Sequence, residues 1–139
     1  MIAILDISTG YRIVGLLHIL SAVVAFGPVF LYPALHRAGQ TETIAKLHLR
    51  MSLPALVVLW VLGMGLAGMS EDAYKVSQTW LVLSIINWVI LMVVSWFLIR
   101  PSLTDTSDDA RSKLAMGSGI THLLLVVGLY LMVFKPGWP

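Results

Sequence analysis

The chain has 139 residues, of which 58% are hydrophobic and 12% are charged, whereas soluble domains average about 45–50% apolar and about 25% charged residues. This composition excludes a soluble enzyme, a nucleic-acid-binding protein and a disordered linker. Nine Lys and Arg against seven Asp and Glu leave a net charge of +2, which implies no basic patch for nucleic acid. The sequence contains no cysteine, which excludes disulfides and thiolate metal sites.

Four long apolar runs predict four membrane-spanning helices, because a helix satisfies its own backbone hydrogen bonds in hydrocarbon. We expect an all-α fold: an antiparallel bundle of four transmembrane helices, with residues 1–139 as one domain. Amphipathic stretches at 43–52 and 108–116 extend the second and fourth helices at their N-terminal ends into the cytoplasm, the latter with Ser107 as N-cap. The spans are residues 13–35, 53–69, 80–99 and 117–134.

The Lys and Arg residues predict how the bundle is oriented in the membrane, and the prolines predict where its helices bend. Six Lys and Arg lie in the first and third loops and three on the other side. By the positive-inside rule, these loops are cytoplasmic and both termini lie outside, in a bacterial plasma (inner) membrane. The first run is full length and no small-residue cleavage site follows it, so no cleavable signal is expected. Kinks are expected at Pro28, Pro33 and Pro54, which lie within helical pattern.

Polar side chains inside the runs are the candidate functional residues. Helical periodicity places His18 and Ser21 on one interior stripe of the first helix, and Asn87 on an interior stripe of the third. His18 and Asn87 have similar depths, so they are able to meet through a hydrogen bond or a water. His18 is a candidate haem axial ligand or proton relay. The structural alternative is a buried histidine that bonds Ser21, Asn87 or a backbone carbonyl and joins helices.

Three further histidines are weaker candidates. His122 lies about 14 Å from His18 along the membrane normal, so one iron does not bridge the two, and we interpret it as a packing or vestibule residue. His36 and His48 flank the first loop near Arg50. A cytoplasmic anion or metal site there is a weaker interpretation than a solvated loop face, because no metal-ligand spacing is present. The seven methionines form no cluster and are interpreted as core filler or loop residues.

Two stretches and the C-terminus resemble known families of small membrane proteins. Leu17-His18-Ile19 with Gly27 and 30–33, and Arg50 to Gly63 with Pro54-Ala55 and Trp60, are similar to the first two helices of the HemJ-type protoporphyrinogen oxidase. The closing Met-Val-Phe-Lys-Pro-Gly at 132–137 resembles a bacterial family of predicted four-helix integral membrane proteins of unknown function.

The resemblance implies a haem b-associated redox protein acting on a porphyrinogen, with His18 as haem ligand. One departure concerns substrate oxidation: the HemJ type has a lysine in its third helix, where this chain has Ser84.

Two functions from different classes follow. The first is a haem b-linked redox protein in which His18 binds iron, Ser21 and Asn87 lie near the cofactor, and His122 and Arg50 are secondary candidates. The alternative is a non-catalytic subunit that packs against a larger membrane complex, or a homo-oligomer, through glycines such as Gly63, Gly65 and Gly68. A transporter ranks last, because all seven acidic residues lie outside the apolar runs.

Overall fold

The computed structural model describes residues 2–138, with side chains described from Thr9 onward. Residues 1 and 139 of the expected domain lie outside this part. The described residues form helices and contain no strand, which confirms the all-α class. Four helical segments are long and apolar enough to cross a membrane, as expected: Thr9–Arg37, Thr41–Gly68, Thr79–Ser102 and Asp108–Phe134.

Three of the four segments are interrupted helices. The first comprises α1 (Ile2–Phe26), a 3-10 turn (Pro28–Leu31) and α2 (Tyr32–Arg37). The second comprises α3 (Thr41–Leu47), a π-helical stretch (His48–Ser52) and α4 (Leu53–Gly68). The third comprises α5 (Thr79–Val93), a π-helical stretch (Val94–Ile99) and a 3-10 turn (Arg100–Ser102), and the fourth is the continuous α6 (Asp108–Phe134).

Prolines account for these interruptions. The regular α-helix breaks at all three positions where kinks were expected, since Pro28, Pro33 and Pro54 each stand at the start of a new helical element. Both π-helical stretches end within two residues of a proline, Pro54 and Pro101. A proline offers no N–H to the carbonyl four residues before it and its ring crowds that carbonyl, so the preceding turn widens.

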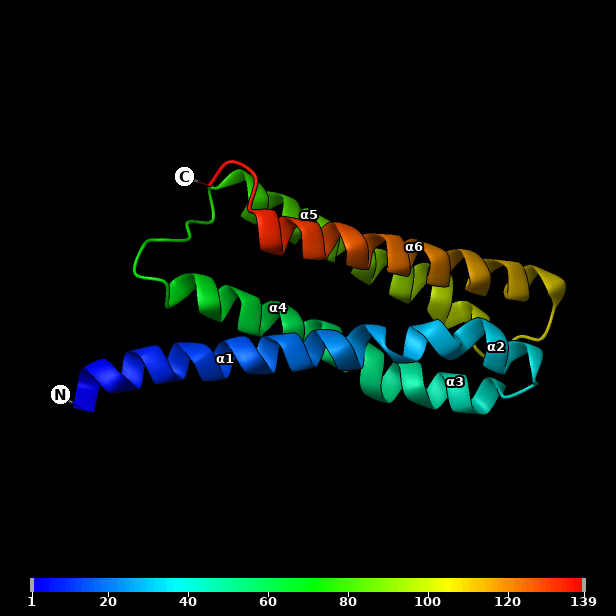
Figure 1. The fold of residues 1–139 in the computed structure, drawn as a ribbon. Helices are drawn as coiled ribbons and strands as arrows, with labels where there is room; N and C mark the ends of the chain where they lie inside the picture. The colour runs from blue at the N-terminus through cyan, green and yellow to red at the C-terminus, as the bar shows by residue number, and fades with distance from the viewer. Residues whose placement is uncertain (1, 139) are drawn as a thin grey trace.

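The helices associate as two pairs. Figure 1 shows α1 lying along α4, and α5 lying along α6. The start of α1, the connection 69–78 and the residues after α6 lie at one end of the molecule, which we call the terminal end. The connections 38–40 and 103–107 lie at the opposite end, which we call the loop end.

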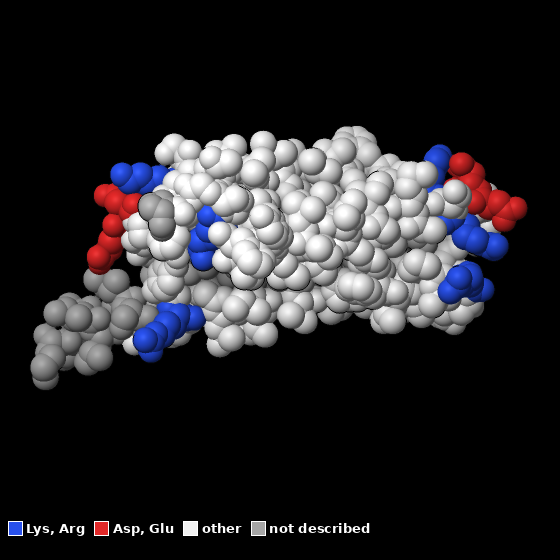
Figure 2. Space-filling view, turned by 45° about the horizontal axis from the view of Figure 1, so that its top comes forward, with Lys and Arg blue, Asp and Glu red and all other residues white. Residues whose placement is uncertain are grey.

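Charged residues gather toward these two ends. On the face in Figure 2, Lys, Arg, Asp and Glu flank a broad band of other residues. Large apolar side chains are exposed along the helices between the ends, among them Ile19, Val61 and Val126. Exposed apolar side chains along spans of this length suit a chain surrounded by hydrocarbon.

The loop end is tightly packed around a polar network. The Tyr32 hydroxyl lies 3.2 Å from His48 Nδ1 and 3.0 Å from Ser52 Oγ, and His48 Nε2 lies 3.2 Å from the Ser95 carbonyl oxygen. All four residues are buried. The apolar side chains around them are Val29, Ile44, Val94, Ile99, Leu103 and Leu114.

The expectation that His36 and His48 form a solvated loop face is wrong. His36 is 4% exposed and its Nε2 donates to the Asp105 carbonyl oxygen (3.0 Å), whereas His48 is fully buried. One face of α3 packs against α2 and covers the end of the first span, while the Lys46 and Glu42 side chains of α3 stay exposed. Both histidines point inward, toward backbone carbonyls of the third segment and of the connection 103–107.

The start of α6 confirms the predicted N-cap at Ser107. The Ser107 side chain accepts a hydrogen bond from the Ala110 N–H (3.1 Å), and Asp108 and Asp109 occupy the first turn, where the helix dipole favours negative charge. The Ser107 N–H in turn donates to the Asp105 carboxylate at 2.9 Å, and this bond lowers the pKa of that carboxyl. The cap therefore fixes where the fourth span begins.

Candidate functional site: a cavity between the helix pairs

A cavity of about 360 Å³ lies between the α1/α4 pair and the α5/α6 pair, toward the terminal end. Along α1 it extends from Tyr11 to Phe26, 15 positions or about 22 Å at about 1.5 Å per residue. Its walls are mostly aliphatic and aromatic. Both the volume and the lining are typical of sites for small organic ligands, which are about 300–1,000 Å³ and mainly apolar.

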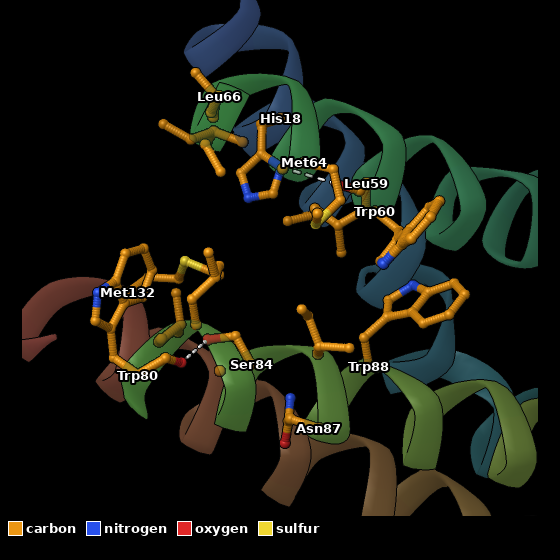
Figure 3. A pocket seen from close by; sticks show the side chains of 18 of the residues that line it. His18, Leu59, Trp60, Met64, Leu66, Trp80, Ser84, Asn87, Trp88 and Met132 are labelled. Atoms are coloured by element: carbon orange, nitrogen blue, oxygen red, sulfur yellow. Dashed lines mark hydrogen bonds between the residues drawn. The ribbon is translucent and has the colours of Figure 1, made fainter. Parts of the chain in front are cut away.

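His18 enters this cavity from α1 because Gly63 leaves room for it on α4. A Cβ atom at Gly63 would come within 3.0 Å of His18 Cε1. Without that atom, the imidazole lies against the α4 backbone, and His18 Nδ1 is 3.0 Å from the Leu59 carbonyl oxygen. Figure 3 shows this bond, with the ring between Leu66 and Met64 on the upper wall of the cavity.

The hydrogen bond to Leu59 determines the tautomer of His18. A carbonyl oxygen only accepts, so Nδ1 carries the proton and donates it. In the neutral ring, Nε2 then keeps its lone pair. This nitrogen faces into the cavity (Figure 3), and no hydrogen bond to a described residue engages it. A histidine whose first nitrogen is held by a carbonyl and whose second is free has the arrangement of a metal-ligating imidazole.

The opposite wall belongs to α5 and α6. Asn87 Nδ2 donates to the Leu124 carbonyl oxygen (3.1 Å), and the Ser84 hydroxyl donates to the Trp80 carbonyl oxygen (2.7 Å). Figure 3 shows Ser84 and Asn87 across the cavity from His18. His18 and Asn87 thus share one cavity, but each bonds a backbone carbonyl on its own side, and no hydrogen bond joins them.

Two tryptophans lie where the helix pairs meet beside the cavity. The rings of Trp60 on α4 and Trp88 on α5 stack with centroids 5.5 Å apart. Trp88 Nε1 donates to the Leu56 carbonyl oxygen at 2.8 Å, across from α5 to α4. This bond ties the two pairs together, so the cavity ends at a cross-linked wall.

Lys135 and an aromatic cluster stand at the terminal end of the cavity. Tyr74 packs edge-on against Trp80 with centroids 5.3 Å apart, and the Trp138 ring lies 5.8 Å from Tyr74. Trp138 Nε1 donates to the Ala73 carbonyl oxygen (3.1 Å), which holds the chain after α6 against the connection 69–78. Tyr74, Trp80 and Lys135 all line the cavity.

The remaining sequence candidates lie away from the cavity. The Ser21 hydroxyl donates to the Leu17 carbonyl within its own helix (2.8 Å). His122 stacks on the Phe30 ring with centroids 3.8 Å apart, and its Nε2 is buried without a partner among the described residues. Arg50 is exposed in the π-helical stretch between α3 and α4 and does not line the cavity. Of the five candidates, the cavity brings together only His18 and Asn87.

Several lining residues were assigned no functional role from the sequence. Met64 and Met132 were interpreted as filler, but both line the cavity, from α4 and α6. Trp60 and Trp88 lie in the interior of their spans instead of at the ends, where tryptophan anchors a helix in the interface. Their mid-span position is the signal that distinguishes them. For Lys135, the sequence offered only a cation beyond the last span.

Comparisons with protein-family models, curated proteins and solved structures found no match to this chain. The resemblance to the HemJ type and to the family of unknown function therefore stays a prediction. Among the described residues, no group of three or more His, Asp or Glu side chains is placed to hold a metal ion.

Proposed function

We propose that the chain is an antiparallel four-span bundle in a bacterial inner membrane, with the loop end in the cytoplasm and the terminal end outside. The four apolar segments, the apolar side chains exposed between the charged ends and the excess of cations at the loop end support this.

Because the sequence contains no cysteine, single substitutions test this orientation directly. Ser77→Cys lies at the terminal end and Thr106→Cys at the loop end, and both side chains are exposed. In intact spheroplasts, a membrane-impermeant maleimide is expected to label only Ser77→Cys, and to label both after lysis. Labelling of Thr106→Cys in intact cells would invert the topology.

We propose further that the cavity binds haem b with His18 as an axial ligand. This proposal rests on the two nitrogens of the His18 ring. Nδ1 donates to the Leu59 carbonyl, which leaves Nε2 unprotonated in the neutral ring and facing an apolar cavity. A haem iron takes most of its ligands from the macrocycle, so one or two protein ligands suffice. This agrees with a cavity that offers one imidazole and no cluster of acidic or histidine ligands among its described residues.

The donor set and the mostly apolar lining of the cavity support this proposal. Two helix pairs form its facing walls, and the thioether of Met132 lies on the wall opposite His18 (Figure 3). A haem bound there supplies one-electron redox chemistry. The chain's own contribution is to orient the imidazole through Leu59 and Gly63 and to surround the group with mostly apolar walls.

The proposal extends to haem binding and electron transfer, and not to oxidation of a porphyrinogen. Where the HemJ type carries a lysine, Ser84 donates its hydroxyl proton to the Trp80 carbonyl. A serine held in this way supplies neither a cation nor a base to a substrate.

An absorption spectrum tests haem ligation. The full chain, purified in a neutral detergent and supplied with haem, is expected to show a Soret band that shifts on reduction with dithionite. His18→Ala removes the nitrogen ligand, so this band is expected to be lost or to shift to that of free haem. His122→Ala is the matched control, because His122 is also a partly exposed histidine within a span but does not line the cavity. It is expected to retain the wild-type spectrum.

A wild-type protein that stays colourless after haem addition would overturn the haem proposal. The accessory-subunit proposal would then lead. One observation favours it: Gly65 and Gly68 on α4 contact nothing within 4 Å of where a Cβ would stand, so this small-residue surface is open to another helix. Native electrophoresis in mild detergent tests whether the chain is such a subunit, since a subunit co-migrates with a larger assembly and an independent protein does not.

A further inference from the structure

Lys135 adopts a backbone conformation that lysine rarely takes. It ends α6 with φ 43° and ψ 60°, in the left-handed region, and its N–H donates to the Leu131 carbonyl oxygen (3.1 Å). Glycine or asparagine usually occupies such a position, because a longer side chain is strained there. Pro136 follows and prevents the helix from continuing. Helix termination alone does not require a lysine here, so its side chain needs a separate explanation.

Three aromatic rings surround the Lys135 ammonium group. Nζ lies 5.5 Å from the ring centroid of Tyr74, 5.8 Å from that of Trp80 and 6.0 Å from that of Trp138. These distances are within the range of cation–π attraction, which is about 6 Å. The rings come from the connection 69–78, from α5 and from the chain after α6. The lysine head is therefore held at the cavity end by three separate segments instead of extending into solvent.

This ammonium group is the source of charge in an otherwise uncharged cavity. Among the described residues that line the cavity, Lys135 alone carries a formal charge. The ion pairs formed by described side chains all lie near the loop end, on α3 and at the start of α6, and none involves Lys135. Aromatic rings attract a cation but do not neutralise it. An anionic group arriving at the cavity therefore meets a preplaced cation partly shielded from water, where attraction is stronger than at an open surface.

We infer that Lys135 binds the acidic group of an amphipathic ligand whose apolar body fills the cavity beside His18. This inference rests on the proposed function and deepens it. For a haem, the acidic group is a propionate carboxylate, and the ligand lies with its acidic edge at the terminal end. The His18 and Lys135 contacts are separate, since one engages a metal and the other a carboxylate. The lysine thereby selects acidic ligands over neutral lipophiles of the same shape.

Metal-free protoporphyrin separates the carboxylate contact from the iron contact, because it has carboxylates and no iron. The full chain in neutral detergent is titrated with protoporphyrin and, in parallel, with its dimethyl ester. Binding is followed by quenching of tryptophan fluorescence, since Trp60, Trp80 and Trp88 line the cavity. The wild-type protein is expected to bind the diacid more tightly than the ester, by about tenfold for one hydrogen-bonded charge.

The variants distinguish ligand recognition from helix termination. Lys135→Asn removes the charge while asparagine tolerates the left-handed backbone, so thermal stability is expected to be kept and diacid affinity to fall about tenfold. Lys135→Arg keeps the charge and is expected to stay within about threefold of wild type. Lys75→Asn is the control, because Lys75 is exposed in the connection 69–78 and does not line the cavity. The dimethyl ester is expected to bind all four proteins equally.

Each other outcome contradicts the inference. Equal affinity for diacid and ester, an unchanged diacid affinity in Lys135→Asn, or no porphyrin binding by the wild-type protein would each overturn the role of Lys135. A loss of ester binding in Lys135→Asn would show that the residue only maintains the structure. The proposed function fails on a different readout, the dithionite-sensitive Soret band of the iron-containing protein and its response to His18→Ala, so the two failures are distinguishable.

Discussion

His48, in the polar network at the loop end, and His18, in the cavity between the helix pairs, use their ring nitrogens in opposite ways. At the loop end, His48 Nε2 donates to the Ser95 carbonyl, so its Nδ1 accepts from the Tyr32 hydroxyl, and Tyr32 in turn accepts from Ser52. In the cavity, Nδ1 of His18 donates to the Leu59 carbonyl and Nε2 stays free. Both rings join helices through a backbone carbonyl. Only one of them keeps a lone pair for a ligand.

Burial by itself does not identify a functional histidine. His48 is the more buried of the two, yet both of its nitrogens are engaged, which makes it part of the packing. The functional candidate is the less buried ring, beside a glycine and an apolar cavity. Because His36 Nδ1 and His122 Nε2 also lack a partner among the described residues, the feature that distinguishes His18 is a free nitrogen together with the apolar cavity that it lines.

The largest effect that we expect is a loss of stability when His48 is replaced. His48→Ala would leave the Tyr32 hydroxyl and the Ser95 carbonyl without their partner and would open a void in a fully buried site. We expect it to lower the free energy of unfolding by about 2–4 kcal/mol. His18→Ala loses one hydrogen bond at a half-buried site and is expected to cost less than about 1 kcal/mol.

Circular dichroism during thermal unfolding in mild detergent measures this difference as a shift in Tm, with each variant compared with wild type under the same conditions. Equal losses for the two variants, or a larger loss for His18→Ala, would contradict the distinction between the two histidines, because His18 would then serve packing as His48 does.

A smaller effect is expected from adding one methyl group beside His18. Gly63→Ala places a Cβ within 3.0 Å of the imidazole Cε1 and would push the ring off the α4 backbone. Haem affinity is expected to fall about tenfold, in keeping with about 1–2 kcal/mol for one oriented contact. Stability is expected to change little, because the ring is the movable end of its side chain and alanine favours the helix over glycine.

Gly65→Ala is the matched control on the same helix. Its Cβ would meet nothing within 4 Å, so haem affinity is expected to be unchanged and stability to rise by up to about 1 kcal/mol from helix propensity. Haem titration followed at the Soret band measures both variants. If Gly63→Ala and Gly65→Ala bound haem equally well, the glycine at 63 would not be what positions His18.

Much of the fold was predictable from local sequence. The four apolar runs gave the number and approximate limits of the spans, because hydrophobic length is a property of each segment alone. The Ser107 cap fixed the start of α6, because capping involves residues within one turn. Pro28, Pro33 and Pro54 marked the breaks in regular helix, because a missing N–H acts on the carbonyl one turn earlier.

Tertiary structure decided which polar residues face one another. The sequence placed His18 and Asn87 on interior stripes, and both line the cavity, but Ser21 instead bonds within its own helix and His122 stacks on Phe30. Helical periodicity gives a direction to each side chain and does not give the rotation of one helix relative to the next. The inward turn of His36 and His48 depended in the same way on α3 packing against α2.

The amino-acid sequence was enough to predict four segments apolar enough to cross a membrane and the approximate limits of their helices, since both depend on residues near one another along the chain. The cavity depends on tertiary packing, because the two helix pairs pack closely at the loop end and enclose a space toward the terminal end. His18, Gly63 and Lys135 are far apart in sequence, and no local rule relates them. Their places around one cavity depend on helix rotation and on the turn after α6, which are set by the packing of the whole molecule.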